Sequence, residues 1–222
     1  ENKKNQIKIF GSELHLIDGP RENSTIEVKK FTELTGINYL SHNYNPFFIE
    51  GMKSFGHEVF NEFHADITDI IIPVGNGSLL IGAVKAYEEL IKLKKISKMP
   101  KMHCIQVEGF SPIVKKFNSS EWKFNEFSKT LAGGIAVSNP PRLNQVIESI
   151  RNSNGKAIEV SEANILNWHK ELASWGFLSE ITCAAALAGT EKLIESGVIN
   201  EKSNIVIPIT GSGLKDLDKV NF

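Results

Sequence analysis

Hydrophobic residues along the chain fall into two recurring patterns. Some form short continuous runs, such as Asp69–Pro73, which are typical of strands covered on both faces. Others recur at steps of three and four, as between Phe47 and Phe63, which indicates amphipathic helices. On these patterns we predict strands at 69–73, 103–107, 157–160 and 205–209, and helices at 47–63, 80–96, 112–117, 143–150, 162–175 and 182–196.

Strands and helices alternate along most of the chain, which favours βαβ units and an α/β fold with an open, mostly parallel sheet flanked by helices. The first 45 residues carry a different pattern. Glu13–Ile17 alternates polar and apolar residues as a strand does, and Ser24 is suited to cap a helix that runs to Thr35 and ends at Gly36. Residues 118–127 have little pattern and are predicted to form a loop.

Composition narrows the function classes. The chain has 222 residues, enough for one large domain or two small ones. It carries 25 Lys and Arg against 26 Asp and Glu, a balance that argues against a nucleic-acid-binding or membrane-anchoring surface. No apolar run approaches the ~20 residues that cross a bilayer. The two cysteines form no disulfide framework and the histidines show no metal-ligand spacing, so we expect a cytoplasmic protein without a metal site.

The first candidate site follows the predicted strand at 69–73. There Pro73–Ser78 forms a turn of small residues that leads into a helix. Glycines leave backbone N–H groups accessible and a helix N-terminus attracts anions, so this turn is suited to a phosphate. It lacks the Gly-Lys-Ser/Thr of a Walker loop, and Leu80 interrupts the glycine spacing of a dinucleotide fingerprint. The alternative is a tight strand-to-helix connection without a ligand.

A second glycine-rich turn, Ile209–Asp216, follows the last predicted strand. Ligands of open α/β sheets bind beyond the carboxyl ends of the strands, so this turn and the one at Gly75 can face the same crevice. Thr210 would then present a hydroxyl to a ring nitrogen of the ligand. The alternative for Thr210 is a turn residue that bonds its own backbone.

A third segment, Trp175–Gly189, places Glu180 before a helix rich in Ala and Gly. Such small residues indicate that the helix packs closely against a neighbour. The helix dipole favours an acid at this position, and this is sufficient to explain Glu180.

Together the three segments resemble the pyridoxal-phosphate enzymes of the tryptophan-synthase β fold (fold type II), and among them threonine synthase most closely. The family's Pro-Val-Gly-Asn-Gly-like loop is matched by Pro73–Ser78, its Gly-Ile-Phe-x-Glu-Pro-Ser-Ser-Ala-Ala element by Gly176–Ala185, and its closing Val-Thr-Gly-x-Gly-Leu-Lys-Asp by Ile209–Asp216. Ile181 stands where the family has Pro. Further matches are Asn45-Pro46 with Glu50-Gly51-x-Lys53, and Gly134–Val137 with Asn139–Arg142.

The resemblance implies a fold type II architecture, in which residues 1–45 are the remnant of a small α/β domain and residues 46–222 form the large cofactor-binding domain. It implies pyridoxal 5′-phosphate as the cofactor, a small-molecule amino-acid substrate and a homodimer. The residues that it implies for the cofactor phosphate are Gly75, Asn76, Gly77 and Ser78. For the pyridine nitrogen it implies a hydrogen bond from Thr210.

Two features depart from the family pattern. The Schiff-base lysine and the Ser-x-Asn loop that contacts the cofactor hydroxyl have no match, and both are expected upstream of Glu1. The chain begins without Met, so we expect it to be the C-terminal part of a longer protein. We expect it to be inactive by itself, because no lysine in it matches the family's position. Phe48 stands where threonine synthases commonly place an Arg that holds the substrate phosphate, and an apolar ring cannot supply that contact.

The resemblance implies the reaction of threonine synthase, which converts O-phospho-L-homoserine to L-threonine and phosphate. Phe48 favours one alternative, a serine or threonine dehydratase or another β-eliminating lyase of the same fold. Another alternative is a non-catalytic relative that binds a phosphorylated ligand. The main hypothesis requires the turns at Gly75 and Thr210 to converge on one ligand.

Overall fold

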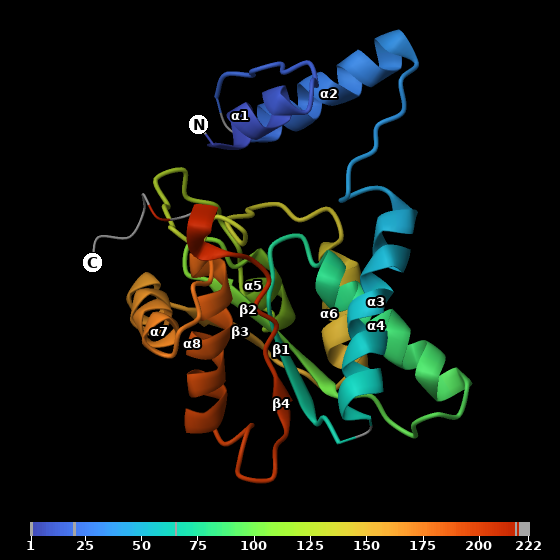
Figure 1. Cartoon of the computed structure of the whole chain (residues 1–222), viewed down its shortest axis with the longest axis vertical. Helices are drawn as coiled ribbons and strands as arrows, with labels where there is room; N and C mark the ends of the chain where they lie inside the picture. Colours follow the sequence, from blue (N-terminus) through green and yellow to red (C-terminus); the bar gives the residue numbers. More distant parts are fainter. Residues whose placement is uncertain (1, 20, 65, 216, 218–222) are drawn as a thin grey trace. The chain divides into compact units, whose positions relative to one another are not determined.

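The computed structural model describes residues 2–19, 21–64, 66–215 and 217. The chain forms two compact units, Glu1–Tyr44 and Asn45–Phe222, whose helices and strands are labelled in Figure 1. Asp216, the last residue of the second glycine-rich turn, lies outside the described residues.

The first unit contains α1 (Asn2–Ile9) and α2 (Arg21–Thr35). As predicted, α2 ends at Gly36, whose φ is +71° and whose N–H donates to the Thr32 carbonyl at 2.9 Å. The predicted cap at Ser24 is wrong, because the helix already includes Arg21. The strand predicted at 13–17 is wrong, because no described residue of this unit forms a partner strand and an isolated strand is not stable. None of the unit's residues with a described burial is buried, so these residues form no hydrophobic core.

In the described residues, the second unit is built on one parallel sheet with the strand order β3-β2-β1-β4 (Figure 1). The strands are β1 (Asp69–Pro73), β2 (Lys101–Val107), β3 (Ala157–Val160) and β4 (Ile205–Val206). The edge strand β4 is shorter than predicted. Only Ile205 and Val206 pair with β1, and Pro208 has no N–H with which to continue the ladder.

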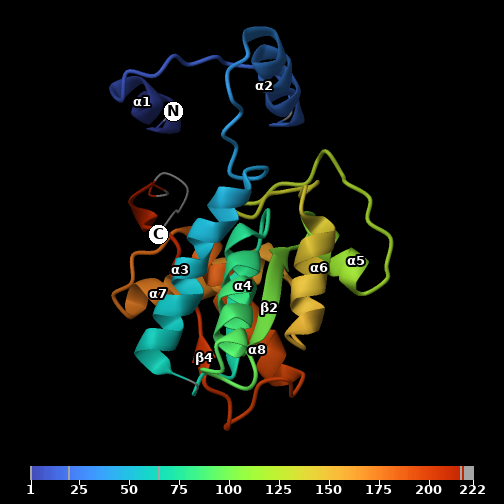
Figure 2. The same ribbon diagram turned by 90° about the vertical axis from the view of Figure 1, so that its right-hand side faces the viewer.

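Helices cover both faces of this sheet, as the predicted α/β fold requires (Figures 1 and 2). Side chains alternate between the faces along a strand, so Ile70 and Ile72 lie in one hydrophobic core and Ile71 in the other. Residues 118–127 form neither helix nor strand, as predicted. The first core is covered by α3 (Pro46–Phe63), α4 (Ser78–Lys92), α5 (Pro112–Phe117) and α6 (Leu143–Asn152), and the second by α7 (Glu162–Ser174) and α8 (Ile181–Glu195).

The two helices α3 and α4 run side by side in the same direction. Met52 of α3 lies against Gly82 of α4, and Gly56 lies against Ala86, so the sequence offset between the helices is maintained along both. Asn45 caps α3: its Oδ1 accepts a hydrogen bond from the N–H of Phe47 at 2.9 Å. The N-termini of α3 and α4 therefore lie at the same end of the unit.

A buried polar pair joins β1 to β2. Nε2 of His103 lies 2.8 Å from Oδ1 of Asp69, and neither side chain is exposed to solvent. The N–H of Lys156 donates to Nδ1 of His103 at 3.1 Å, so the ring proton is on Nε2, which donates to Asp69. Burial raises the pKa of Asp69, but hydrogen bonds from His103 and Thr68, together with the nearby charge of Lys101, lower it by more, and the net direction is down.

Candidate functional site

The turn that follows β1 presents a row of backbone donors. Within the part of the chain that the structure describes, the N–H groups of Gly75, Asn76, Gly77 and Ser78 donate to no protein acceptor. Gly77 is the N-cap of α4, and no side chain caps this helix. Free N–H groups at a helix N-terminus carry partial positive charge, so this turn is suited to an anion with several oxygens.

Both glycines of this turn lie against backbone or core atoms that leave no room for a side chain. A Cβ on Gly75 would lie 2.7 Å from the carbonyl oxygen of Gly134. A Cβ on Gly77, whose φ is +86°, would lie 2.2 Å from Cγ2 of Val146 on α6. The donors are therefore supplied by backbone in a position where only glycine fits.

Gln106, which the sequence analysis did not single out, holds this turn in place. Its Nε2 donates to the carbonyl of Val74 at 3.2 Å, while its Oε1 accepts from the N–H groups of Ile113 and Val114 at 2.9 and 3.2 Å. Gln106 is fully buried in β2. The sequence does carry a signal for Gln106, which is an uncharged polar residue next to apolar residues of a predicted strand. A buried amide must find hydrogen-bond partners, so such a residue is expected to bind other groups of the protein.

The second glycine-rich turn follows β4 and pairs with the segment before α8. The N–H of Glu180 donates to the carbonyl of Gly211, and the N–H of Gly213 donates to the carbonyl of Leu178, both at 2.9 Å. An isolated bridge between Ser179 and Ser212 lies between these bonds. The backbone at Thr210 is thus fixed relative to the N-terminus of α8.

Within this turn, the Thr210 hydroxyl is close to two side chains. It donates to Oε1 of Glu180 at 3.3 Å and lies 3.5 Å from Sγ of Cys183. Glu180 is the N-cap of α8, where the helix dipole favours an acid, but its side chain makes no capping hydrogen bond. Its carboxyl group instead packs against Gly211, and a Cβ added to Gly211 would lie 2.5 Å from Cδ of Glu180.

The two turns lie at the same edge of the sheet, because β1 and β4 are neighbouring parallel strands and both turns follow their carboxyl ends. A short set of contacts joins them. The carbonyl of Gly134 faces Gly75, and the N–H of Gly134 donates to the hydroxyl of Thr182 at 3.1 Å. The next residue, Cys183, contacts Thr210. This bridge of Gly134 and α8 is not among the contacts predicted from the sequence.

Two lysines, one in α3 and one in α4, are held in ion pairs. Nζ of Lys53 lies 2.6 Å from carboxylate oxygens of both Glu50 and Glu89, and Lys85 pairs with Glu50. Hydrogen bonds, first to Glu50 and then to Glu89, raise the pKa of Lys53. A nucleophilic lysine needs a lowered pKa, so Lys53 is not suited to covalent chemistry.

Phe48, at the position that departs from the family pattern, lies in the first turn of α3 with 38% of its surface exposed.

In the described residues, no group of three His, Cys, Asp or Glu side chains could hold a metal ion. No helix formed by those residues combines the length and the apolar character needed to cross a membrane.

Comparison with known proteins gives a consistent result. A family model described as "Pyridoxal-phosphate dependent enzyme" matches residues 1–211. The threonine synthase of Methanocaldococcus jannaschii is 31% identical over 217 residues, which cover 96% of this chain and 53% of that protein. The threonine synthase of Methanosarcina acetivorans is 35% identical over 182 residues, 80% of this chain and 45% of that protein. The chain thus spans about half the length of these curated relatives.

Solved structures with the same fold include two further activities. The processed form of threonine deaminase isoform 2 from Solanum lycopersicum superimposes with a TM-score of 0.79 at 20% identity, covering 98% of this chain and 58% of that one. Maize serine racemase superimposes with a TM-score of 0.80 at 19% identity, covering 97% of this chain and 64% of that one. At these identities the likeness concerns the fold alone.

Proposed function

The chain belongs to the family of pyridoxal-phosphate dependent enzymes, and from this premise we propose that the protein is a lyase of the threonine synthase type. The predicted family, fold type II architecture and cofactor are confirmed. The proposed reaction converts O-phospho-L-homoserine and water to L-threonine and phosphate. Similarity to curated threonine synthases over most of this chain supports it.

The observation that carries the proposal is the row of four N–H donors at Gly75–Ser78, none of which has a protein acceptor within the described residues. We assign the cofactor phosphate to this row. A phosphate offers several acceptor oxygens, and the α4 dipole favours its charge. The Cβ-excluding contacts of Gly75 and Gly77 support this fit, because they hold the donors in a fixed arrangement.

Thr210 is the residue we assign to the pyridine nitrogen. Its hydroxyl lies beyond the carboxyl end of β4, next to the β1 turn, and the bridge through Gly134 and Thr182 fixes the two turns relative to each other. When bound, pyridoxal 5′-phosphate supplies an electron sink for the amino-acid substrate. Lys53 and Lys85 are engaged in ion pairs, so we assign neither as the lysine that anchors the cofactor.

We assign the second unit to the large cofactor-binding domain, residues 46–222, and residues 1–45 to a small α/β domain. Both glycine-rich turns and the strands that precede them belong to the second unit. A homodimer is part of the same proposal, since it is the habit of the family that the sequence resembles. A cytoplasmic location is also part of it, because the two cysteines form no disulfide framework.

A titration of the chain tests the cofactor site. Pyridoxamine 5′-phosphate, which cannot bond covalently to a lysine, should bind, and its unphosphorylated form should bind at least about tenfold more weakly, since charge-assisted hydrogen bonds to the phosphate are lost. Asn76→Asp places a negative charge at the turn and should weaken binding of the phosphorylated form alone. Asn152→Asp, at the exposed end of α6, is the matched control. Equal affinity for both compounds would contradict the assignment.

The second candidate function is a serine or threonine dehydratase, which Phe48 favours. An exposed apolar ring in the first turn of α3 offers a substrate phosphate no charged hydrogen bond. Parallel assays with O-phosphohomoserine, serine and threonine separate the two candidates. Turnover of phosphohomoserine supports the synthase, and turnover of only the other two supports the dehydratase. If the protein is a dehydratase, Phe48→Arg should improve its binding of phosphohomoserine, because the guanidinium can pair with the substrate phosphate.

A further inference from the structure

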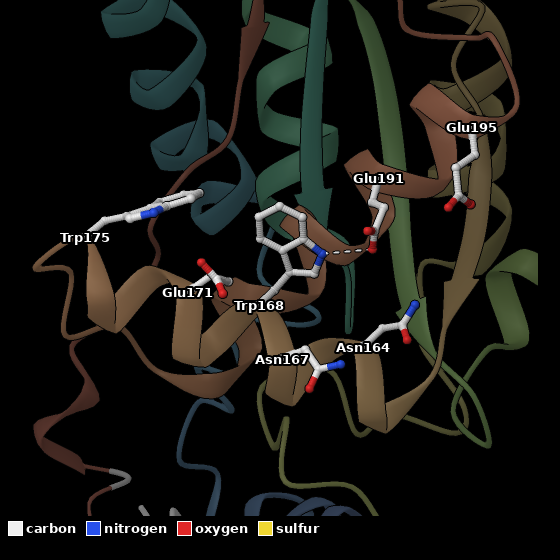
Figure 3. A pocket seen from close by; sticks show the side chains of 7 residues that line it. All are labelled: Asn164, Asn167, Trp168, Glu171, Trp175, Glu191 and Glu195. Carbon is white, nitrogen blue, oxygen red and sulfur yellow. Dashed lines mark hydrogen bonds between the residues drawn. The ribbon is translucent and has the colours of Figure 1, made fainter.

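A groove with a volume of about 480 Å³ lies between α7 and α8 (Figure 3). Among the described residues that line it, none belongs to either glycine-rich turn. The lining consists of two tryptophans, three glutamates and two asparagines: Asn164, Asn167, Trp168, Glu171, Trp175, Glu191 and Glu195. The groove is therefore a separate feature of the fold with its own chemistry.

One wall comes from a single face of α7, because its lining residues recur at steps of three and four from Asn164 to the residue that ends the helix, Trp175. At ~1.5 Å per residue this face is ~16 Å long, so the groove is elongated. Glu191 and Glu195 reach toward it from α8, one turn apart (Figure 3).

The two indole rings lie next to each other in this groove. Their centroids are 6.1 Å apart and their planes meet at 70°, so they form a corner rather than a stack. The indole N–H of Trp168 donates to Oε2 of Glu191 at 3.0 Å, which fixes the orientation of that ring (Figure 3). Trp175 is 55% exposed, an unusual position for so large an apolar side chain.

The charges of the groove are of one sign. Glu171, Glu191 and Glu195 contribute three carboxylates, and no Lys or Arg is among the described lining residues. Carboxylates and aromatic faces both attract cations, and the asparagine amides can hydrogen-bond a charged amine through their oxygens. Inorganic divalent cations prefer shells of oxygen ligands and gain nothing from an indole. The combination points to an organic cation.

We propose that this groove binds a linear aliphatic polyamine. Its ammonium groups would pair with the separated carboxylates of Glu171 and Glu195, and its methylene segments would cover the indole rings. The length of the groove suits a chain with several charges rather than a compact ion. Its volume lies in the range of sites for small molecules, which is about 300–1,000 Å³.

Calorimetric titration of the chain with spermidine tests the proposal, with 1,4-butanediol as a neutral comparison and Mg²⁺ as a cation without an aliphatic chain. Spermidine should bind, increasingly weakly as salt is added, and butanediol should not. Trp175→Ala should weaken binding about 2–5-fold, because the apolar ring surface that the methylene segments cover is lost. Phe127→Ala, at another exposed aromatic residue, is the matched control.

The carboxylates are tested by the double variant Glu171→Gln with Glu195→Gln. It should bind spermidine about 3–20-fold more weakly, the sum of two exposed ion pairs. The control is Glu148→Gln with Glu201→Gln, two exposed carboxylates outside the groove. Thermal unfolding of each variant establishes that the fold is intact. Absence of spermidine binding, unchanged binding in both groove variants, or equal heats for Mg²⁺ and spermidine would each overturn the proposal.

Discussion

The hydroxyl of Thr210 donates a hydrogen bond to the carboxylate of Glu180 at 3.3 Å. A hydroxyl has one proton and two lone pairs, so while it donates to Glu180 it can only accept from another partner. A threonine hydroxyl that donates to no other group can donate to an unprotonated pyridine nitrogen. The pair of Thr210 and Glu180 instead suits a nitrogen that carries a proton.

Substitution of Glu180 tests this relationship. In the wild-type chain, the nitrogen of bound ¹⁵N-labelled pyridoxamine 5′-phosphate should have the chemical shift of a protonated pyridine. In Glu180→Leu, Thr210 regains its proton for donation, and the shift should move toward that of the unprotonated ring. Thr210→Val removes the hydroxyl and serves as the comparison. An identical nitrogen shift in the wild type and Glu180→Leu would contradict the role given to Glu180.

Gly77→Ala should be strongly destabilising. The methyl group would meet Cγ2 of Val146, and φ at this position is +86°. Overpacking and a left-handed backbone together cost about 2–5 kcal/mol of unfolding free energy. Val146→Ala alone should cost about 2 kcal/mol through its lost methyl groups.

The double variant Gly77→Ala with Val146→Ala should cost at least about 1 kcal/mol less than the sum of the two single variants, because the smaller side chain removes the clash. Denaturant unfolding of the four proteins measures this coupling. Strict additivity would show that the contact between positions 77 and 146 is not what excludes a side chain.

The buried pair of Asp69 and His103 predicts a pH-dependent contribution to stability. Asp69→Asn should lower the unfolding free energy by about 1.5–3 kcal/mol at pH 7, because a hydrogen bond to a charged group is lost. The pKa of Asp69 is lower in the folded state than its unfolded value of about 3.9. The stabilisation is therefore fully present above about pH 5 and is lost as the pH falls through the folded pKa.

Unfolding experiments at pH 7 and at pH 3 compare Asp69→Asn with the wild type, and the difference should shrink at the lower pH. Asp66→Asn, at an exposed carboxylate, should change stability by less than about 0.5 kcal/mol at either pH. His103→Phe removes the imidazole donor from the buried Asp69 carboxylate, which keeps the hydrogen bond from Thr68, and should cost about 1.5–3 kcal/mol. A constant effect of Asp69→Asn across this pH range would contradict the assignment.

Hydrogen exchange should differ sharply between the two units. The first unit has no buried residue among those with a described burial, whereas β1 is almost entirely buried. We expect the amides of α2 to exchange at least about a hundredfold faster than those of β1 and α8, since protection follows buried contacts. Mass spectrometry of peptides from each unit measures this, and equal protection would show that residues such as Leu34 and Leu40 are covered in solution.

The second unit could be predicted from sequence to a large extent, because its signals are physical and local. A continuous apolar run such as Ile70–Ile72 predicts a strand covered on both faces, and Asn45 or Ser161 before a helical pattern predicts a cap. The period-two pattern of Glu13–Ile17 failed because a strand also needs a partner, which no local pattern encodes. Pro208 similarly ended β4 earlier than its apolar run indicated.

The candidate site was predictable only in part. Parallel strands place the turns at Gly75 and Thr210 on one edge of the sheet, so their proximity could be expected. The partners of individual side chains could not, because they depend on tertiary packing. Glu180 fits a helix-dipole interpretation in sequence, yet in the structure its carboxylate accepts from Thr210. The contacts of Gly134 with Thr182 join residues 48 apart and have no local signal.

The threefold hydrogen bonding of Gln106 has a consequence for directed evolution of this scaffold. Glu at this position would lose the donor to Val74, and Leu would lose the acceptor for Ile113 and Val114 as well. Among the described residues, the half-buried side chains of Asn76 and Ser78 take part in no hydrogen bond or ion pair. Libraries aimed at a new ligand can therefore vary the rim of the turn, while position 106 is closed to variation.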